Sequence, residues 1–375
     1  MRGRRATELG LIILASLVIC GAYALAALGR TASIPANVVP FLGVILGLLA
    51  LAHVGMRRLA PNADGLLLPL AGLLNGIGYV FIARLDTRLA GLQSTWSALG
   101  VAAFLATLFI VRRTRDLERY RYTFALLGVG LLMMPLVPVL GRNINGARLW
   151  VRLGPITLQP GEFAKIALAI FFASYLVEKA EILSLANKVG PFYLPKLQPR
   201  HIGPLLLAWG FSLMVMTFER DLGSSLLFFT LFVSMLWVAT ARGAYLTIGF
   251  GLFAAGATMA ASAFAHVASR VRIWLNPWPY AADQGYQLVQ SLYAFGSGGL
   301  SGTGLSLGSP QKIPEIETDF IFAAIGEELG LIGTTAIVVA YLLMVGIGIR
   351  IALRAEAPFE KLLACGLTTI LGLQT

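Results

Sequence analysis

The sequence contains few charged residues for its length. Only 13% of its 375 residues are Asp, Glu, Lys or Arg, whereas 57% are hydrophobic, and the mean hydropathy is +0.79. Soluble domains carry about a quarter charged residues, so a water-facing surface cannot cover most of this chain. The apolar runs also lack the alternating segments of about ten residues that are typical of a transmembrane barrel. The composition therefore favours a bundle of membrane-spanning helices.

Cysteine and histidine are almost as scarce. Cys20 and Cys365 lie in distant apolar runs, which excludes a disulfide framework and a paired metal site. The three histidines are scattered near the ends of apolar segments, and we interpret them as interfacial residues rather than metal ligands: His53, His201 and His266. No nucleic-acid motif accompanies the net charge of +11, so we attribute the basic excess to membrane topology.

The fold class that follows is all-α: a polytopic transmembrane bundle with about eleven spanning segments. Each segment approaches the roughly 20 residues that a spanning helix needs. They lie near 8–29, 37–55, 65–84, 93–111, 122–140, 161–177, 203–218, 222–240, 244–266, 320–349 and 361–375.

Lys and Arg concentrate in the loops on one side of this bundle, which predicts a cytoplasmic N-terminus. The long loops near 141–161 and 267–319 then lie outside. The first apolar segment is too long to be a removable signal peptide and lacks a small-residue cleavage site. Segment 361–375 is short for a span, so we expect the sequence to stop within a membrane segment.

The residues up to about 60 form a candidate appended helix pair. The turn-like stretch Ala60-Pro61-Asn62-Ala63-Asp64 separates them from the core at 61–375.

The first outer loop ends at a charged helix start. Pro160 is tolerated in a first helical turn, so the next helix begins near Gln159. Glu162 and Lys165 then share one helix face. An ionisable group more than a turn inside the membrane needs a partner or a polar cavity. The pair either pins the helix or forms a cationic site for a phosphate, and the sequence leaves both open.

The second outer loop contains an isolated acid. Asp283 is the only carboxylate between Asp221 and Glu315, and the loop is rich in aromatic rings and in cations such as Arg270 and Arg272. An aspartate within hydrogen-bond reach can act as the base for a sugar hydroxyl. The alternative is an aspartate that only shapes a solvated turn.

Two further patterns are less specific. The glycine-rich stretch 296–304 could cradle a phosphate, but no strand precedes it, which excludes a dinucleotide-binding fold. Glu327 and Glu328 lie about two turns into a span, which indicates a functional site or a buried pair. A carboxylate cluster here could also hold a divalent cation, the one cofactor that the sequence suggests.

Together these stretches resemble the SEDS family (shape, elongation, division and sporulation proteins), whose members RodA and FtsW are peptidoglycan glycosyltransferases. The resemblance covers roughly 65–375. It is carried by Leu74 to Gly78, Asn145 to Gly154, Gln159 to Lys165, Asp221 to Gly223, Asn276-Pro277-Trp278, Gly285 to Gln287, Thr318 to Phe322 and Gly326 to Gly330.

The family usually has ten spanning helices. The resemblance therefore implies a variant with two extra N-terminal helices and without the last helix. The family's catalytic aspartate stands in an Asp-Pro pair soon after the Asn-Pro-Trp stretch. Tyr280 occupies that place here, and we expect Asp283 to supply the carboxylate.

The resemblance implies that lipid II is both donor and acceptor, polymerised at the outer face of the bacterial cytoplasmic membrane during elongation or division. It also implies a class B penicillin-binding protein, a transpeptidase, as partner. Asp283 would be the catalytic residue, and the expected substrate-binding residues are Arg148, Trp150, Arg152, Glu162, Lys165, Arg220, Asp221, Arg270, Arg272 and Asp319. The alternatives are a lipid II flippase, which is a transporter, and a non-catalytic scaffold of a cell-wall synthesis complex.

Overall fold

The computed structural model describes residues 2–375 apart from 32–37, 139, 145–146, 155, 185, 190–191, 196–209, 211–221 and 264. Long helices dominate it, which confirms the predicted helical class. The chain forms two compact units, one of residues 1–112 with 259–347 and the other of 113–258 with 348–375. Each unit is described by itself.

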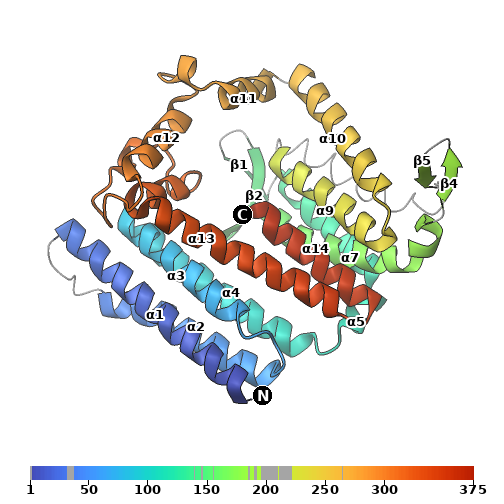
Figure 1. The fold of residues 1–375 in the computed structure, drawn as a ribbon, viewed down its shortest axis with the longest axis horizontal. Coiled ribbons are helices and arrows are strands. Elements are labelled where there is room, and N and C mark those ends of the chain that lie inside the picture. The colour runs from blue at the N-terminus through green and yellow to red at the C-terminus, as the bar shows by residue number, and fades with distance from the viewer. Residues whose placement is uncertain are drawn as a thin grey trace. The chain divides into compact units, whose positions relative to one another are not determined.

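Four long helices run side by side in the first unit, coloured blue to cyan in Figure 1: α1 (Arg2–Thr31), α2 (Val38–Leu59), α3 (Leu67–Leu85) and α4 (Thr87–Ile110). α1 packs along α3, and α2 along α4. Gly76 on α3 admits the buried Ile19 of α1, because a Cβ at residue 76 would lie 2.1 Å from the Ile19 Cδ1. The helices that the sequence sets apart as an N-terminal pair therefore pack closely on the next two.

The first unit also contains the second predicted outer loop and most of the helix that follows it. Within that loop lie α11 (Ala265–Leu275) and the amphipathic α12 (Tyr286–Gly298). The next helix, α13 (Ile321–Arg354), begins in this unit and ends in the other. A small apolar core joins Phe81 of α3, Ala294 of α12 and Ala324 of α13.

α13 is kinked at Gly330. This residue has φ +66°, in the left-handed region that glycine adopts at little cost. The loop after α12 lies against the kink, where the Leu331 N–H donates to the Gly299 carbonyl (2.9 Å) and the Ile332 N–H to the Leu300 carbonyl (3.1 Å). The Leu331 and Ile332 N–H groups therefore donate to the loop instead of to carbonyls of their own helix.

The second unit is built around α7 (Pro160–Ser184), most of whose middle turns are buried. Leu168, Phe172 and Leu176 of α7 form the centre of a large apolar core. The surrounding helices are α5 (Thr114–Arg119), α6 (Arg121–Met133), α9 (Leu222–Thr240), α10 (Ala244–Ala263), which crosses into the first unit near its end, and α14 (Pro358–Gln374).

The first predicted outer loop folds as a three-stranded antiparallel sheet, with strands β1 (Gly141–Ile144), β2 (Ala147–Leu153) and β3 (Ile156–Leu158) in that order. A hairpin of β4 (Ala186–Val189) and β5 (Phe192–Pro195) follows α7. At 141–161 the sequence predicted only a long outer loop.

Six of the described helices are long and apolar enough to cross a membrane: 6–29, 42–59, 67–85, 87–110, 223–240 and 321–354. Two shorter apolar helices cover 121–136 and 244–259. The segment expected near 203–218 lies outside the described residues. The membrane class therefore stands, while the number of eleven spans stays a prediction.

We predict that Gly330→Ala destabilises the protein. A residue with a Cβ is about 1–2 kcal/mol less stable than glycine in the left-handed conformation. The new Cβ would also lie 2.3 Å from the Gly302 nitrogen. The apparent melting temperature in detergent should fall by several degrees. Gly346→Ala on the same helix is the control, because nothing lies within 4 Å of its Cβ position. Equal melting temperatures for the two variants would show that the kink is not constrained.

Candidate functional site

The three-stranded sheet presents basic side chains on one face. Successive side chains of a strand point to opposite faces, so Arg148, Trp150 and Arg152 share one face of β2, while the fully buried Val151 points to the other. Both arginines are exposed and Trp150 is half-buried. The sheet thus brings together three of the predicted substrate-binding residues.

β1 adds an arginine that the sequence analysis missed. Arg142 is paired with Trp150 across the antiparallel ladder, and directly opposed residues lie on the same face. Arg142 is exposed and therefore joins Arg148 and Arg152. The alternation of polar and apolar residues over 147–153 is the sequence signal that could have revealed the strand and its arginine face.

The predicted pair at the start of α7 forms. Lys165 Nζ donates to Glu162 Oε1 at 2.6 Å, and the lysine side chain is only 3% exposed, whereas that of Glu162 is 47% exposed. The second carboxylate oxygen of Glu162 accepts a hydrogen bond from Gln374 Nε2 on α14 (3.0 Å). Glu162 therefore neutralises the charge of the buried Lys165, and the Glu162 carboxylate remains partly exposed to solvent.

Asp283 lies in a tight turn between Tyr280 and α12. The N–H groups of Asp283 and Gly285 both donate to the Tyr280 carbonyl, at 3.0 and 2.8 Å. A Cβ at residue 285 would lie 2.9 Å from two backbone carbonyl oxygens, so the turn requires glycine there. The Asp283 side chain is exposed and forms no ion pair with the described residues.

The two cations predicted for this loop lie on α11, next to the Asp283 turn. Arg270 and Arg272 are exposed, and Ser269 Oγ donates to Gln284 Oε1 at 2.5 Å, which ties α11 to the turn. Trp274 is 75% exposed and Trp278 54% exposed. Aromatic side chains of this kind settle at the membrane–water interface, which agrees with the predicted position of the loop.

Asp319 is exposed and lies just before α13, where its N–H donates to the Glu315 carbonyl (2.9 Å). The next carboxylates along the chain, Glu327 and Glu328, are buried in α13. Glu328 forms an ion pair with Arg84 of α3 (2.5 Å) and accepts from the Ser306 N–H (2.9 Å). The two glutamates are therefore a buried structural cluster, one of the two readings that the sequence allowed.

The glycine-rich stretch lies against the same two glutamates. The Thr303 and Gly304 N–H groups donate to the Glu327 and Glu328 carbonyls, and beyond the stretch the Ser309 N–H donates to Glu327 Oε1. These N–H groups are therefore not free to cradle a phosphate. The described residues also contain no group of three or more metal-ligating side chains.

The structure groups the described site residues in two places. The second unit holds the sheet arginines, Trp150 and the Glu162–Lys165 pair, while the first unit holds Asp283, Arg270, Arg272 and Asp319. Two predicted residues, Arg220 and Asp221, lie outside the described residues.

We predict that Arg84→Met destabilises the first unit, because it leaves Glu328 buried without its cation. Breaking one side of a buried pair costs about 3–5 kcal/mol, which should lower the melting temperature strongly. Glu328→Gln in the same chain should restore much of the loss, since a neutral amide still accepts from Ser306. Arg88→Met, at an exposed arginine nearby, is the control. A double variant no more stable than Arg84→Met would contradict the pairing.

Comparisons with known proteins agree with the sequence motifs and the fold. The family model described as "Cell cycle protein" (FtsW, RodA, SpoVE) matches residues 70–375. The "Peptidoglycan glycosyltransferase RodA" of Mycobacterium tuberculosis is 41% identical over 99% of this chain and 81% of its own length. The "Probable peptidoglycan glycosyltransferase FtsW" of Geobacter metallireducens is 33% identical over 79% of this chain and 74% of its own length.

A solved structure supports the fold. It is described as "Structural coordination of polymerization and crosslinking by a peptidoglycan synthase complex", and one of its chains is similar to this chain with a TM-score of 0.55 and 23% identity. The match covers 89% of this chain and 84% of that one. With the family model spanning most of the sequence, these findings identify the protein as a membrane protein of the FtsW/RodA/SpoVE (SEDS) family, to which this chain belongs.

Proposed function

We propose that this chain is a peptidoglycan glycosyltransferase that polymerises lipid II at the outer face of the bacterial cytoplasmic membrane. The observation that carries the proposal is the 41% identity, over nearly the whole chain, with relatives named for that activity. The exposed acid and arginines on the two predicted outer loops are the groups that such a reaction needs.

The reaction joins two lipid II molecules. The 4-hydroxyl oxygen of the acceptor GlcNAc attacks C1 of the donor MurNAc, and the bond between C1 and the phosphate oxygen breaks. Undecaprenyl pyrophosphate leaves with the bonding electrons, and a β-1,4 linkage forms. The hydroxyl proton passes to a base, for which we propose Asp283, since a carboxylate within hydrogen-bond reach can accept it.

The turn around Asp283 supports this role although the family's Asp-Pro pair is missing. Tyr280 occupies the family's aspartate position, and the Asp283 N–H is bonded to the Tyr280 carbonyl. The two residues therefore belong to one tight turn, and a shift of three positions keeps the carboxylate on it. The exposed side chain is open to a sugar hydroxyl.

The leaving pyrophosphate develops negative charge, which fixed cations stabilise. We assign this role to Arg148, Arg152 and Lys165, with Trp150 beside them and Glu162 orienting the lysine. On the other loop the candidate cations are Arg270 and Arg272, and outside the described residues Arg220. Asp319 and Asp221 stay predicted substrate-binding residues, but as anions they do not stabilise the leaving group. A divalent cation stays a suggestion of the sequence. Glu327 and Glu328 already bond to backbone N–H groups and Arg84, which does not fit a metal site, and we derive no step through one.

We further propose a class B penicillin-binding protein as partner. A polymerase makes strands that a transpeptidase must crosslink. The similar solved chain comes from a complex described as coordinating polymerization with crosslinking. The exposed aromatic residues of the second outer loop offer a surface for such a protein or for lipid headgroups.

We predict that Asp283→Asn abolishes polymerisation. Removing a general base costs typically about 10²–10⁴-fold in rate, and the exposed side chain makes its loss harmless to folding. An in-gel assay on fluorescent lipid II would measure the glycan. Asp116→Asn, at an exposed aspartate of α5, is the matched control. Wild-type glycan from the Asp283 variant would remove this residue as the base.

The same assay separates the two roles of Lys165. If its ammonium binds the donor phosphate, Lys165→Met raises the KM for lipid II while the folded protein persists. If it only pins α7, the variant loses melting temperature and its KM for lipid II stays unchanged.

A further inference from the structure

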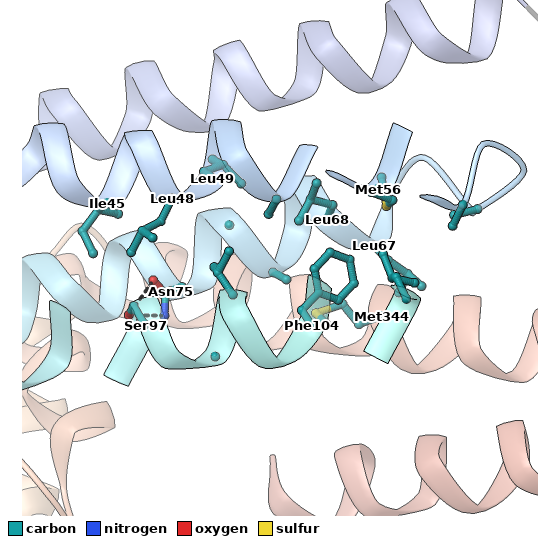
Figure 2. A pocket seen from close by; sticks show the side chains of 18 of the residues that line it. Ile45, Leu48, Leu49, Met56, Leu67, Leu68, Asn75, Ser97, Phe104 and Met344 are labelled. Carbon is teal, nitrogen blue, oxygen red and sulfur yellow. Dashed lines mark hydrogen bonds between the residues drawn. The ribbon is translucent and has the colours of Figure 1, made fainter. Parts of the chain in front are cut away.

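An apolar cavity of about 660 Å³ lies in the first unit among α2, α3, α4 and α13. Its lining includes Ile45, Leu48 and Leu49 of α2, Leu68 of α3, Phe104 of α4 and Met344 of α13. Figure 2 shows these side chains converging from several helices around a common space. Ligand sites are typically about 300–1,000 Å³, so the cavity is large enough for a small molecule. None of the site residues described above lines it.

The cavity opens on the cytoplasmic side of the predicted membrane. It begins at the turn that contains Ala60, Ala63 and Asp64, which the predicted topology places on that side. Along α4 its lining runs from Leu108 to Gln93, about 22 Å at 1.5 Å per residue. One leaflet of a hydrocarbon core about 30 Å thick is about 15 Å deep. The cavity therefore extends from the cytoplasmic side through the inner leaflet and past the predicted midplane.

A polar pair marks the deep part of the cavity. Asn75 Nδ2 of α3 donates to Ser97 Oγ of α4 at 3.4 Å, as the dashed lines in Figure 2 show. The two side chains hydrogen-bond to each other. The lining between this pair and the turn at 60–64 is apolar. Such a lining fits a hydrocarbon chain and offers little to a polar solute.

The cytoplasmic end of the cavity is flanked by cations. Arg58 occupies the last turn of α2, and the exposed Arg112 follows the end of α4, whereas the neighbouring Arg57 is paired with Glu8. Asp64 is the one carboxylate in the lining, and its Oδ1 accepts from the Leu66 N–H. The surplus of positive charge complements an anionic headgroup at the inner surface.

We propose that this cavity binds an acyl chain of an anionic phospholipid from the cytoplasmic leaflet, with the headgroup beside Arg58 and Arg112. The proposal is independent of the glycosyl transfer. The polyprenyl substrate of that reaction carries its headgroup at the opposite membrane face, so it would enter from the other leaflet.

Gly100 of α4 provides a test. It lines the cavity, and nothing lies within 4 Å of its Cβ position, so a leucine there fills space rather than displacing the protein. Gly91 of the same helix has equally open surroundings but does not line the cavity. Gly91→Leu is therefore the matched control, and Ala71→Leu, at a lining residue of α3, repeats the test if Gly100→Leu does not fold.

The measurement is native mass spectrometry of the full chain in detergent, titrated with phosphatidylglycerol and separately with phosphatidylcholine. We expect one phosphatidylglycerol to bind tightly to the wild type and to Gly91→Leu. Gly100→Leu should weaken binding roughly tenfold, the loss for two methylene groups displaced from an apolar site. Replacing both Arg58 and Arg112 by Gln should remove the preference over phosphatidylcholine.

Three results would overturn the proposal. One is equal phosphatidylglycerol affinity of a folded Gly100→Leu or Ala71→Leu variant and the wild type. Another is equal affinity of the wild type for the two phospholipids. The third is that the wild type purifies with a bound polyprenyl phosphate, and that the Gly100→Leu and Ala71→Leu variants purify without it.

Discussion

An ionisable side chain within an apolar helix is stable only beside a partner, because hydrocarbon does not solvate charge. This constraint governs the buried charges of the described chain. Three sets are ion pairs: Glu8 with His53 and Arg57, Arg84 with Glu328, and Lys165 with Glu162. The buried Glu327 instead accepts a hydrogen bond from the Ser309 N–H. The first set joins α1 to α2, and the second joins α3 to α13 and its glycine-rich loop. The first two sets therefore join neighbouring helices, while the third lies within α7.

The same pairs hold the elements that carry the candidate site residues. Arg84 and Glu328 hold the loop that follows α12, and α12 begins at the turn that carries Asp283. Lys165 and Glu162 hold the first turns of α7, directly after the arginine-bearing sheet. Asp283 and the sheet arginines, proposed to act in the reaction, are exposed, whereas Glu328 and Lys165, which hold their elements in place, are buried.

Composition and apolar runs were enough to predict the helical membrane class, and the motifs were enough to predict the family. The Glu162–Lys165 pair followed from helical spacing alone. The sheet at 141–158 was missed because its alternating pattern covers only seven residues, and with it Arg142, whose position depends on strand pairing. The partner of Glu328 could not be found from sequence, because Arg84 lies far away in the chain and only the packing of α3 on α13 brings the two together.

Whether the chain makes glycan or moves lipid II across the bilayer can be measured with the purified protein in proteoliposomes, with fluorescent lipid II added to the leaflet at the predicted outer face. We expect β-1,4-linked strands that lysozyme digests, formed without transfer of lipid II to the other leaflet. Lipid II that changes leaflets while no strand forms would contradict it.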